Sequence, residues 1–252
     1  MKIITVAIIT SYITTAFVSC GIEDYVYLYP VSAGNISVEL NSEATIRLPA
    51  IDTNEYYYFS CFTIYYRIYI SDSLQSGHID EGIMSTLNPT LYSDYNAFLP
   101  YINSETTIST SIGTLFSNRN YRSLTLEGVT IDDVLSKDSL GKTIILDFPP
   151  TPGTIPGLII NDTWYNLRRS NGNGSFSPLP ENRYFLNHPD LNSSVNASST
   201  INADVANIST AAEVRYTYVS LYIVVTGIDS NFSPIYSTPA FIGILRLPDA
   251  SV

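Results

Sequence analysis

The sequence has few of the residues that bind nucleic acids and metals. Among its 252 residues, 12 are Lys or Arg and 23 are Asp or Glu, which gives a net charge of −11. Nucleic-acid grooves depend on clustered Lys and Arg, so we expect no nucleic-acid partner. The two histidines, His78 and His188, have no second imidazole or thiol nearby in sequence. Because protein zinc sites need three or four ligands, we expect no transition metal, and nothing in the sequence implies another cofactor.

Motifs of known catalytic chemistry are also missing. No Gly-x-Ser-x-Gly elbow occurs, and no glycine-rich phosphate loop follows a strand and opens a helix. Asp80-Glu81 and Asp132-Asp133 lack the alternating oxygen ligands and central Gly of a calcium loop. We therefore predict that the protein is not an enzyme. An exported hydrolase is the alternative, because Ser-His-Asp triads assemble from distant positions and the sequence has many serines.

Long apolar runs are confined to the N-terminus. Met1-Lys2 precedes residues 3–18 (IITVAIITSYITTAFV), which contain no acidic side chain. One positive charge followed by such a run is typical of a secretory signal, so we predict a signal peptide over residues 1–19. No later stretch reaches about 18 apolar residues, and we expect no transmembrane helix after it. The protein is therefore predicted to be exported.

The end of this run, Phe17-Val18-Ser19-Cys20-Gly21, resembles the lipobox of bacterial lipoproteins. The resemblance implies that Cys20 is acylated, with palmitate among its chains, and becomes the first residue of the mature protein. Stable attachment takes two or three acyl chains, so the predicted partner is membrane lipid, at a bacterial cell membrane or outer membrane. An ordinary secretory signal cleaved after Ser19 or Cys20 is the alternative.

If Cys20 carries lipid, the other cysteine, Cys61, has no intramolecular disulfide partner. We expect a buried free thiol there. The chain also has seven Asn-x-Ser/Thr sequons, which we attribute to a composition rich in these residues; they leave open a secreted glycoprotein that binds host proteins. The sequons begin at Asn35, Asn161, Asn173, Asn192, Asn196, Asn207 and Asn231.

Strand-forming residues are what the sequence has in abundance. It contains 20 Tyr against one Trp and two Met, and Tyr, Ile, Val and Thr all favour strands. Over residues 56–70, the even positions from 58 onward are apolar except Ser60, and the odd positions are mixed, which predicts a half-buried strand. Further strands are expected at residues 25–29, 36–40, 44–48, 106–116, 121–126, 143–148, 157–168, 214–226 and 240–247, and a short helix or turn at 131–136.

Part of this pattern resembles a known sandwich. Residues 65–69 (YYRIY), 219–226, the turn 227–234 and residues 240–247 (AFIGILRL) resemble the third strand and the last two strands of a fibronectin type III domain. The resemblance implies an all-β fold, with a fibronectin type III-like sandwich formed by residues 20–70 and 214–252. Residues 71–213 are then a large, mainly β insertion or a second β-rich subdomain.

Other stretches, spread over most of the mature chain, carry a second resemblance. They are residues 20–30 (CGIEDYVYLYP), 164–170 (WYNLRRS), 183–187 (RYFLN) and 241–248 (FIGILRLP). Together they resemble a group of uncharacterised spirochaete lipoproteins. The resemblance implies a cell-envelope address, a lipid anchor and a β-rich fold, and it implies no known activity.

The tyrosines suggest where a ligand would bind. Tyr57, Tyr65 and Tyr69 share one face of the predicted strand 56–70. An exposed Tyr offers a rigid apolar face and a hydroxyl, which suits recognition of a protein or a carbohydrate. Tyr65 and Tyr69 form the candidate binding patch, although such rings also serve as core residues and cross-strand pairs. We predict a membrane-anchored lipoprotein of the bacterial envelope that acts as a binding or structural module.

Overall fold

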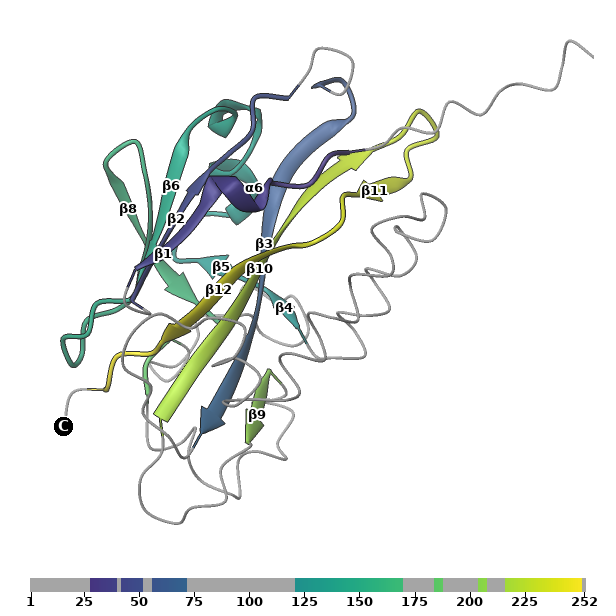
Figure 1. The fold of residues 1–252 in the computed structure, drawn as a ribbon. Coiled ribbons are helices and arrows are strands. Elements are labelled where there is room, and N and C mark those ends of the chain that lie inside the picture. The colour runs from purple at the N-terminus through teal and green to yellow at the C-terminus, as the bar shows by residue number, and fades with distance from the viewer. Residues whose placement is uncertain are drawn as a thin grey trace, which may run out of the picture.

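A computed structural model of the chain shows two β-sheets packed face to face around one hydrophobic core (Figure 1). The structure describes residues 28–39, 42–51, 56–71, 121–169, 184–187, 204–207 and 216–250. Strands dominate this part of the chain, and its helices are short. The predicted all-β sandwich is therefore confirmed.

The first sheet has six strands in the order β1-β2-β6-β7-β8-β5. Every neighbouring pair in it is antiparallel. Two of its strands come from residues 36–47, and the other four come from residues 125–168. The strands are β1 (Ile36–Glu39), β2 (Glu43–Arg47), β5 (Thr125–Leu126), β6 (Thr143–Asp147), β7 (Gly157–Ile160) and β8 (Thr163–Arg168).

The second sheet is built on two long strands, β3 (Phe59–Ser71) and β10 (Tyr216–Ile228), which pair antiparallel along their whole length. The outer edge of β10 pairs with β11 (Pro234–Tyr236) and β12 (Ala240–Arg246). The outer edge of β3 pairs with β4 (Arg122–Ser123) and, in parallel, with β9 (Val205–Asn207). Each long strand is thus flanked by two short ones.

Period-2 alternation places the core as the sequence predicts. In β3 the even residues Phe62, Ile64, Tyr66 and Ile68 are fully buried between the sheets. The facing strands supply the rest of this core, which includes Ala44, Ile46, Ile144, Leu146, Leu158, Leu167, Val219, Leu221, Ile223 and Val225. The opposite face of the second sheet is apolar as well, because Tyr121, Tyr222 and Val224 form a second buried cluster there.

The helical elements are short, as expected for residues 131–136. Helix α6 (Ile131–Val134) begins after Thr130, whose side chain accepts a hydrogen bond from the backbone N–H of Asp133 at 3.2 Å. The 3-10 helix η3 (Lys137–Ser139) follows, and η1 (Ala33–Asn35) precedes β1. None of the helices among the described residues has the length and hydropathy that a membrane span requires.

The sequence expectation of one strand over residues 157–168 is wrong. Asn161 and Asp162 both have positive φ, 50° and 59°, and they turn the chain into the β7–β8 hairpin. A two-residue turn with two left-handed residues matches the twist of a hairpin, and Asn and Asp tolerate that conformation best after Gly. The expected strand at 25–29 also differs, because residues 28 and 29 lie outside any strand. The strand expected at 106–116 lies outside the described residues.

The sequence predicts that residues 71–213 are an insertion or a second β-rich subdomain. Within the described part of it, β5 to β8 belong to the same sheet as β1 and β2, and Ile144, Leu158 and Leu167 lie in the one core. Residues 121–169 are therefore an integral part of the sandwich. The structure shows an all-β sandwich and does not identify the fibronectin type III fold specifically, so the likeness to that family stays a resemblance.

Candidate functional site

The outer face of β8 carries an exposed aromatic side chain beside half-buried polar ones. Alternation along β8 directs Leu167 into the core, with Tyr165 packed against it, so Trp164, Asn166 and Arg168 lie on the outer face. Trp164 is the only tryptophan in the chain, and its side chain is 41% exposed. A large aromatic residue on the solvent side of a sheet is a candidate for ligand contact.

The indole of Trp164 rests on a glycine of the neighbouring strand. A Cβ atom added to Gly157 would lie 2.2 Å from Trp164 Cε2, so only glycine leaves room for the ring. The Nε1–H of Trp164 donates a hydrogen bond to Asn166 Oδ1 at 2.8 Å. Contact on one side and a hydrogen bond at the edge fix the ring's orientation.

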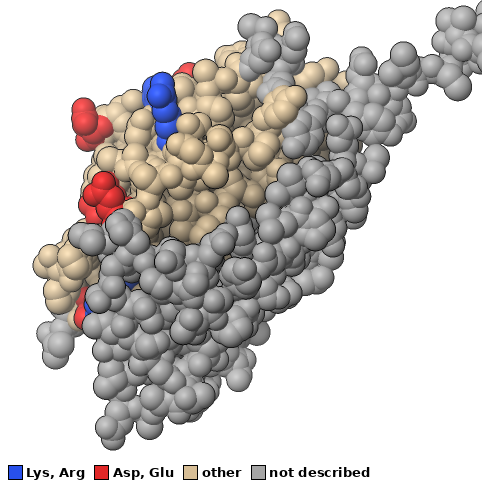
Figure 2. All heavy atoms as spheres, viewed as in Figure 1, with Lys and Arg blue, Asp and Glu red and all other residues tan. Residues whose placement is uncertain are grey.

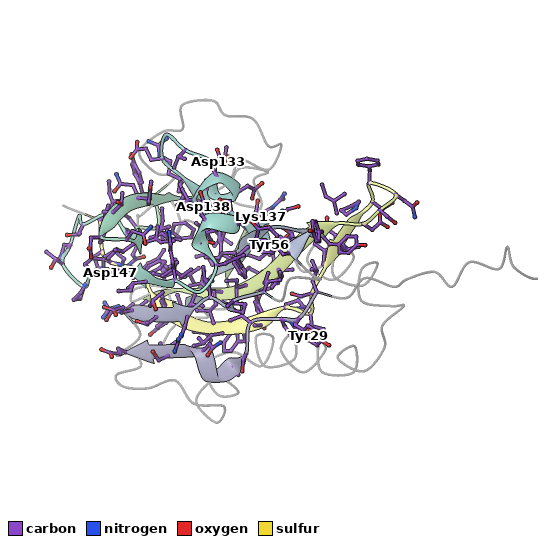
Figure 3. The ribbon with its side chains drawn as sticks, turned by 90° about the horizontal axis from the view of Figure 1, so that it is seen from above. Tyr29, Tyr56, Asp133, Lys137, Asp138 and Asp147 are labelled. Carbon is purple, nitrogen blue, oxygen red and sulfur yellow. The ribbon has the colours of Figure 1, made fainter. Side chains whose placement is uncertain are left out.

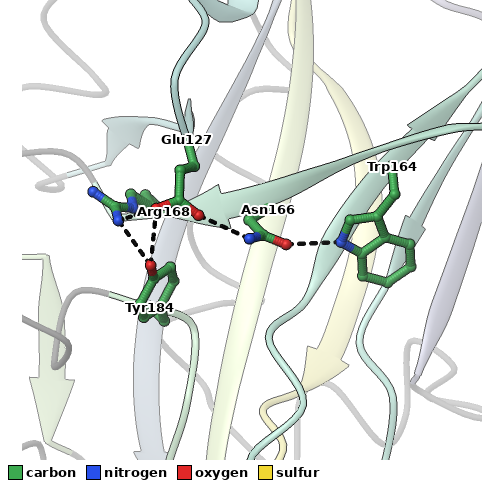
Figure 4. Close-up of polar contacts among 5 residues, drawn as sticks. All are labelled: Glu127, Trp164, Asn166, Arg168 and Tyr184. Carbon is green, nitrogen blue, oxygen red and sulfur yellow. Dashed lines mark hydrogen bonds and ion pairs between the residues drawn. The ribbon is translucent and has the colours of Figure 1, made fainter.

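A continuous chain of polar contacts runs from Trp164 across the edge of the sheet (Figure 4). Asn166 Nδ2 donates to Glu127 Oε2 at 2.8 Å, and Arg168 forms an ion pair with Glu127 Oε1. Arg168 Nη2 also donates to Tyr184 Oη at 2.7 Å. We call Trp164, Asn166, Glu127, Arg168 and Tyr184 the Trp164 ladder.

Segments far apart in sequence bring the ladder together. Glu127 follows β5, which pairs with β8, and Thr125 Oγ1 donates to the backbone oxygen of Arg168 at 2.9 Å. Tyr184 lies in the segment 184–187, which is anchored by Phe185. The Phe185 ring is buried and packs edge-on against Tyr66, with 4.8 Å between ring centroids. Tyr184 is thereby held beside Arg168.

The ladder holds an ionised carboxylate. The hydrogen bond from Asn166 has the largest effect on the pKa of Glu127 and lowers it; burial opposes this shift, and the Tyr184 hydroxyl and Arg168 add to it, so the pKa is lowered overall. The guanidinium of Arg168 also lies 4.9 Å from the centre of the Tyr184 ring. At neutral pH the carboxylate therefore accepts hydrogen bonds, and the charges of the ladder are balanced.

Half-buried apolar side chains extend this surface across the sheet. Ile159 is the register partner of Trp164, and Ile145 is the register partner of Ile159, which places the three in one row on the outer face. An acidic row runs beside it through Glu43 and Asp147, which face each other across β2 and β6. Within the described residues, no group of three or more His, Cys, Asp or Glu side chains is arranged to hold a metal ion.

Of the three tyrosines expected on one strand face, Tyr57 is placed differently. Tyr57 precedes β3 and is 83% exposed, so it does not share a strand face with Tyr65. Tyr65 is half-buried against the second cluster, and burial, with a smaller effect of Tyr236, raises its pKa to about 12. Tyr69 lies on β3 opposite Tyr218, and its side chain is outside the described part of the structure. The patch of Tyr65 and Tyr69 therefore stays a prediction.

Of the remaining predicted residues, the structure describes one and leaves three outside its described part. Cys61 is confirmed as a buried free thiol, and its Sγ lies 3.0 Å from Thr226 Oγ1. Cys20, His78 and His188 lie outside the described residues. Sequence reasoning missed the ladder, although the alternation Trp164, Asn166, Arg168 was a readable signal for its β8 side chains.

A buried polar cluster lies on the inner side of the ladder. Arg169 is 1% exposed, and it pairs with Asp204 through Nε to Oδ2 at 2.8 Å and Nη2 to Oδ1 at 2.6 Å. Tyr66 Oη donates to Asp204 Oδ2 at 2.8 Å. Burial alone would lower the pKa of Arg169, but the bonds and charge of Asp204 outweigh it and leave that pKa raised. These groups tie β3, β8 and β9 together and do not reach the surface.

Comparison with known proteins gives no relative for this chain. No protein-family model, no curated protein and no solved structure matches it. The case for a function therefore depends on the residues described above.

Proposed function

We propose that the protein is an exported lipoprotein, held at a bacterial membrane by acyl chains on Cys20, that acts as a binding module through the Trp164 ladder. The proposed ligand is a carbohydrate. The observation that carries the binding proposal is the exposed indole of Trp164, which packs against Gly157 and has its edge joined to a chain of planar polar side chains.

The sequence around Cys20 supports the anchor. A signal-like run ends at Ser19-Cys20-Gly21. Leu28 and Val31 are both buried in the core. Cys20 precedes Leu28 by eight residues in the sequence, so the proposed anchor is close in sequence to the sandwich.

The chemistry of the ladder supports a sugar ligand. A sugar ring presents C–H groups on its faces and hydroxyls at its edge. The electron-rich face of an indole attracts such C–H groups. Amide, carboxylate and guanidinium groups beside the ring match pairs of hydroxyls, because each has two polar atoms at fixed spacing. Asn166, Glu127 and Arg168 supply one group of each kind.

Two of the stretches that carry the resemblance to spirochaete lipoproteins meet in the ladder. Residues 164–170 supply Trp164, Asn166 and Arg168, and residues 183–187 supply Tyr184. An isolated bridge pairs the backbones of Arg168 and Tyr184. The resemblance and the contacts thus point to the same surface.

Tryptophan fluorescence tests the binding proposal, because Trp164 is the only tryptophan. The acylated chain in detergent micelles is titrated with oligosaccharides of N-acetylglucosamine, glucose and mannose and with soluble peptidoglycan fragments. We expect at least one of them to shift or quench the emission, and Asn166→Ala to weaken its binding by about tenfold or more. Thr143→Ala, a matched change at an exposed position on the outer face of β6, is expected to leave the affinity unchanged.

Two results would overturn parts of the proposal separately. If no sugar of the panel changes the emission, the carbohydrate assignment is wrong, and protein recognition by the same surface takes its place. If palmitate labelling of the full chain persists in Cys20→Ala, or mass spectrometry finds an unmodified first residue, the anchor is wrong. Each measurement leaves the other conclusion standing.

A further inference from the structure

Large side chains are exposed together at one end of the second sheet. Phe232 is 89% exposed, Tyr57 83%, Tyr29 66% and Ile228 47%. Figure 3 shows Tyr29 and Tyr56 toward the side from which the β10–β11 hairpin projects, with Asp147 on the opposite side. We call Tyr29, Tyr57, Ile228 and Phe232 the apolar end.

Close contacts join the three segments that form the apolar end. The backbone N–H of Ile228 donates to the carbonyl oxygen of Tyr58 at 2.8 Å. A Cβ atom added to Gly227 would lie 2.2 Å from that same oxygen and 2.9 Å from Leu28 Cδ1. Residues 28, 58 and 227 are therefore in contact, and Tyr29, Tyr57 and Ile228 are their direct neighbours in sequence.

The hairpin loop holds Phe232 outward. Asp229 Oδ1 accepts hydrogen bonds from the backbone N–H groups of Asn231 at 2.8 Å and Ser233 at 2.7 Å, so its charge is partly satisfied within the loop. Phe232 has a φ of 62°, in the left-handed region that is costly for a bulky residue. A strained phenylalanine that is almost fully exposed gains little from the fold, which points to a contact outside it.

The N-terminal connection leads to this same end. Cys20 precedes Leu28 by eight residues, and eight extended residues span at most ~29 Å. The two long strands of the second sheet have 13 residues each, or roughly 43 Å. An anchor on Cys20 therefore keeps the Leu28 end of the sheet within ~29 Å of the bilayer. Because this distance is shorter than the roughly 43 Å length of the long strands, the Leu28 end is the end favoured to face the membrane.

We propose that the apolar end rests on the surface of the bilayer in which the acyl chains of Cys20 are embedded, with Phe232 and Ile228 inserted between the lipid headgroups. This inference rests on the lipid anchor proposed above. Aromatic side chains such as Tyr29 and Tyr57 are favoured at the boundary between headgroups and acyl chains. The sandwich then has a fixed orientation, with a defined end toward the membrane.

The charge of the protein indicates which lipid surface fits. The net charge is −11, and the face of the described residues shown in Figure 2 carries few charged side chains. Attraction to anionic lipids needs clusters of Lys and Arg. The contact is therefore apolar, and it forms on zwitterionic phosphatidylcholine with little dependence on salt.

Brominated lipids test the contact with the acylated full chain in phosphatidylcholine vesicles. The double variant Trp164→Phe/Phe232→Trp carries its only tryptophan at the tip of the hairpin. We expect its emission to shift to the blue on reconstitution and to be quenched about twofold or more by lipids brominated near the headgroups. The wild-type chain is the matched control, since its only tryptophan, Trp164, lies on the other sheet and is expected to remain unquenched.

The outcomes separate this proposal from the lipid anchor. Acylated protein in vesicles whose hairpin tryptophan is not quenched would overturn the membrane contact and leave the anchor intact. A blue shift that occurs without lipid and grows with protein concentration would also overturn it, because the apolar end would then join two copies of the chain. Loss of acylation in the wild-type chain would instead remove the anchor, and unacylated protein that binds vesicles through Phe232 would still support the contact. Thermal unfolding of the double variant checks that the fold is kept.

Discussion

Asp204 accepts hydrogen bonds from two different strands through one buried carboxylate. Its oxygens accept from Tyr66 on β3 and from Arg169 at the end of β8, and the exposed fractions of Asp204 and Arg169 are 3% and 1%. Asp204→Ala would leave the Arg169 guanidinium buried without a counter-charge. We expect the free energy of unfolding to fall by about 3–5 kcal/mol, measured by equilibrium urea unfolding.

Two comparisons give this prediction its controls. Glu39→Gln alters an exposed acidic residue on β1 and is expected to change the unfolding free energy by no more than about 0.5 kcal/mol. Replacing both partners, Arg169→Met with Asp204→Leu, is expected to recover most of the loss, because no unpaired charge then remains buried. An Asp204→Ala variant as stable as Glu39→Gln would show that the ion pair does not hold these strands together.

At the level of strands, the pair Glu43–Asp147 works against the first sheet. The two carboxylates are register partners across β2 and β6, and burial, together with the Glu43 charge, raises the pKa of Asp147 above its ordinary value of 3.8. Asp147→Asn is expected to raise the unfolding free energy at pH 7 by about 0.2–1 kcal/mol, measured by thermal unfolding, because like charges face each other across the strands.

The pH dependence of this gain has a definite sign. Folding raises the pKa of Asp147, so the wild-type protein gains stability from its protonation as the pH falls through the folded-state pKa. The advantage of Asp147→Asn should therefore be largest at neutral pH and vanish near pH 3. Glu43→Gln should give a similar gain, and the double variant less than the sum of the two. A gain that persists at pH 3 would mean that charge repulsion is not its cause.

Local patterns predict individual strands better than they predict the surfaces that strands form together. Alternation along residues 56–70 correctly identified the buried row of β3, because side-chain direction in a strand depends only on local geometry. The Asn161-Asp162 turn was within reach of the same reasoning, since both residue types accept positive φ. Without that turn, the sequence pattern did not predict the β7–β8 hairpin, which places Trp164 against Gly157.

Non-local partners explain what the sequence did not show. Glu127 is 39 residues from Asn166, and Tyr184 is 16 residues from Arg168, so the ladder exists only once β5 and the segment 184–187 pack beside β8. Non-local partners also explain why Tyr65 is half-buried and not exposed as expected. Alternation places it on the second face of β3, but a pattern of one strand cannot reveal that this face is also covered by an aromatic cluster.

For the whole molecule, the decisive feature is that one core joins both sheets. Leu167 of β8, Ile46 of β2 and Ile64 of β3 are fully buried in the same cluster, although Leu167 lies more than a hundred residues from the other two in sequence. Separate subdomains would each need a core of their own. The described part of the chain is therefore expected to unfold cooperatively, as a single unit.

The chain carries one probe in each sheet that can test this expectation. Trp164 reports on β8 of the first sheet by fluorescence, and Cys61 reports on β3 of the second sheet by pulsed alkylation in a Cys20→Ala background. Burial raises the pKa of Cys61 above its ordinary value of 9.0, so native protein should react slowly at pH 8 and unfolded protein rapidly. We expect the two urea transitions to have the same midpoint, because loss of either sheet exposes the core of the other. If the fluorescence transition instead precedes the alkylation transition, the first sheet unfolds on its own, and the described part of the chain is not a single cooperative unit.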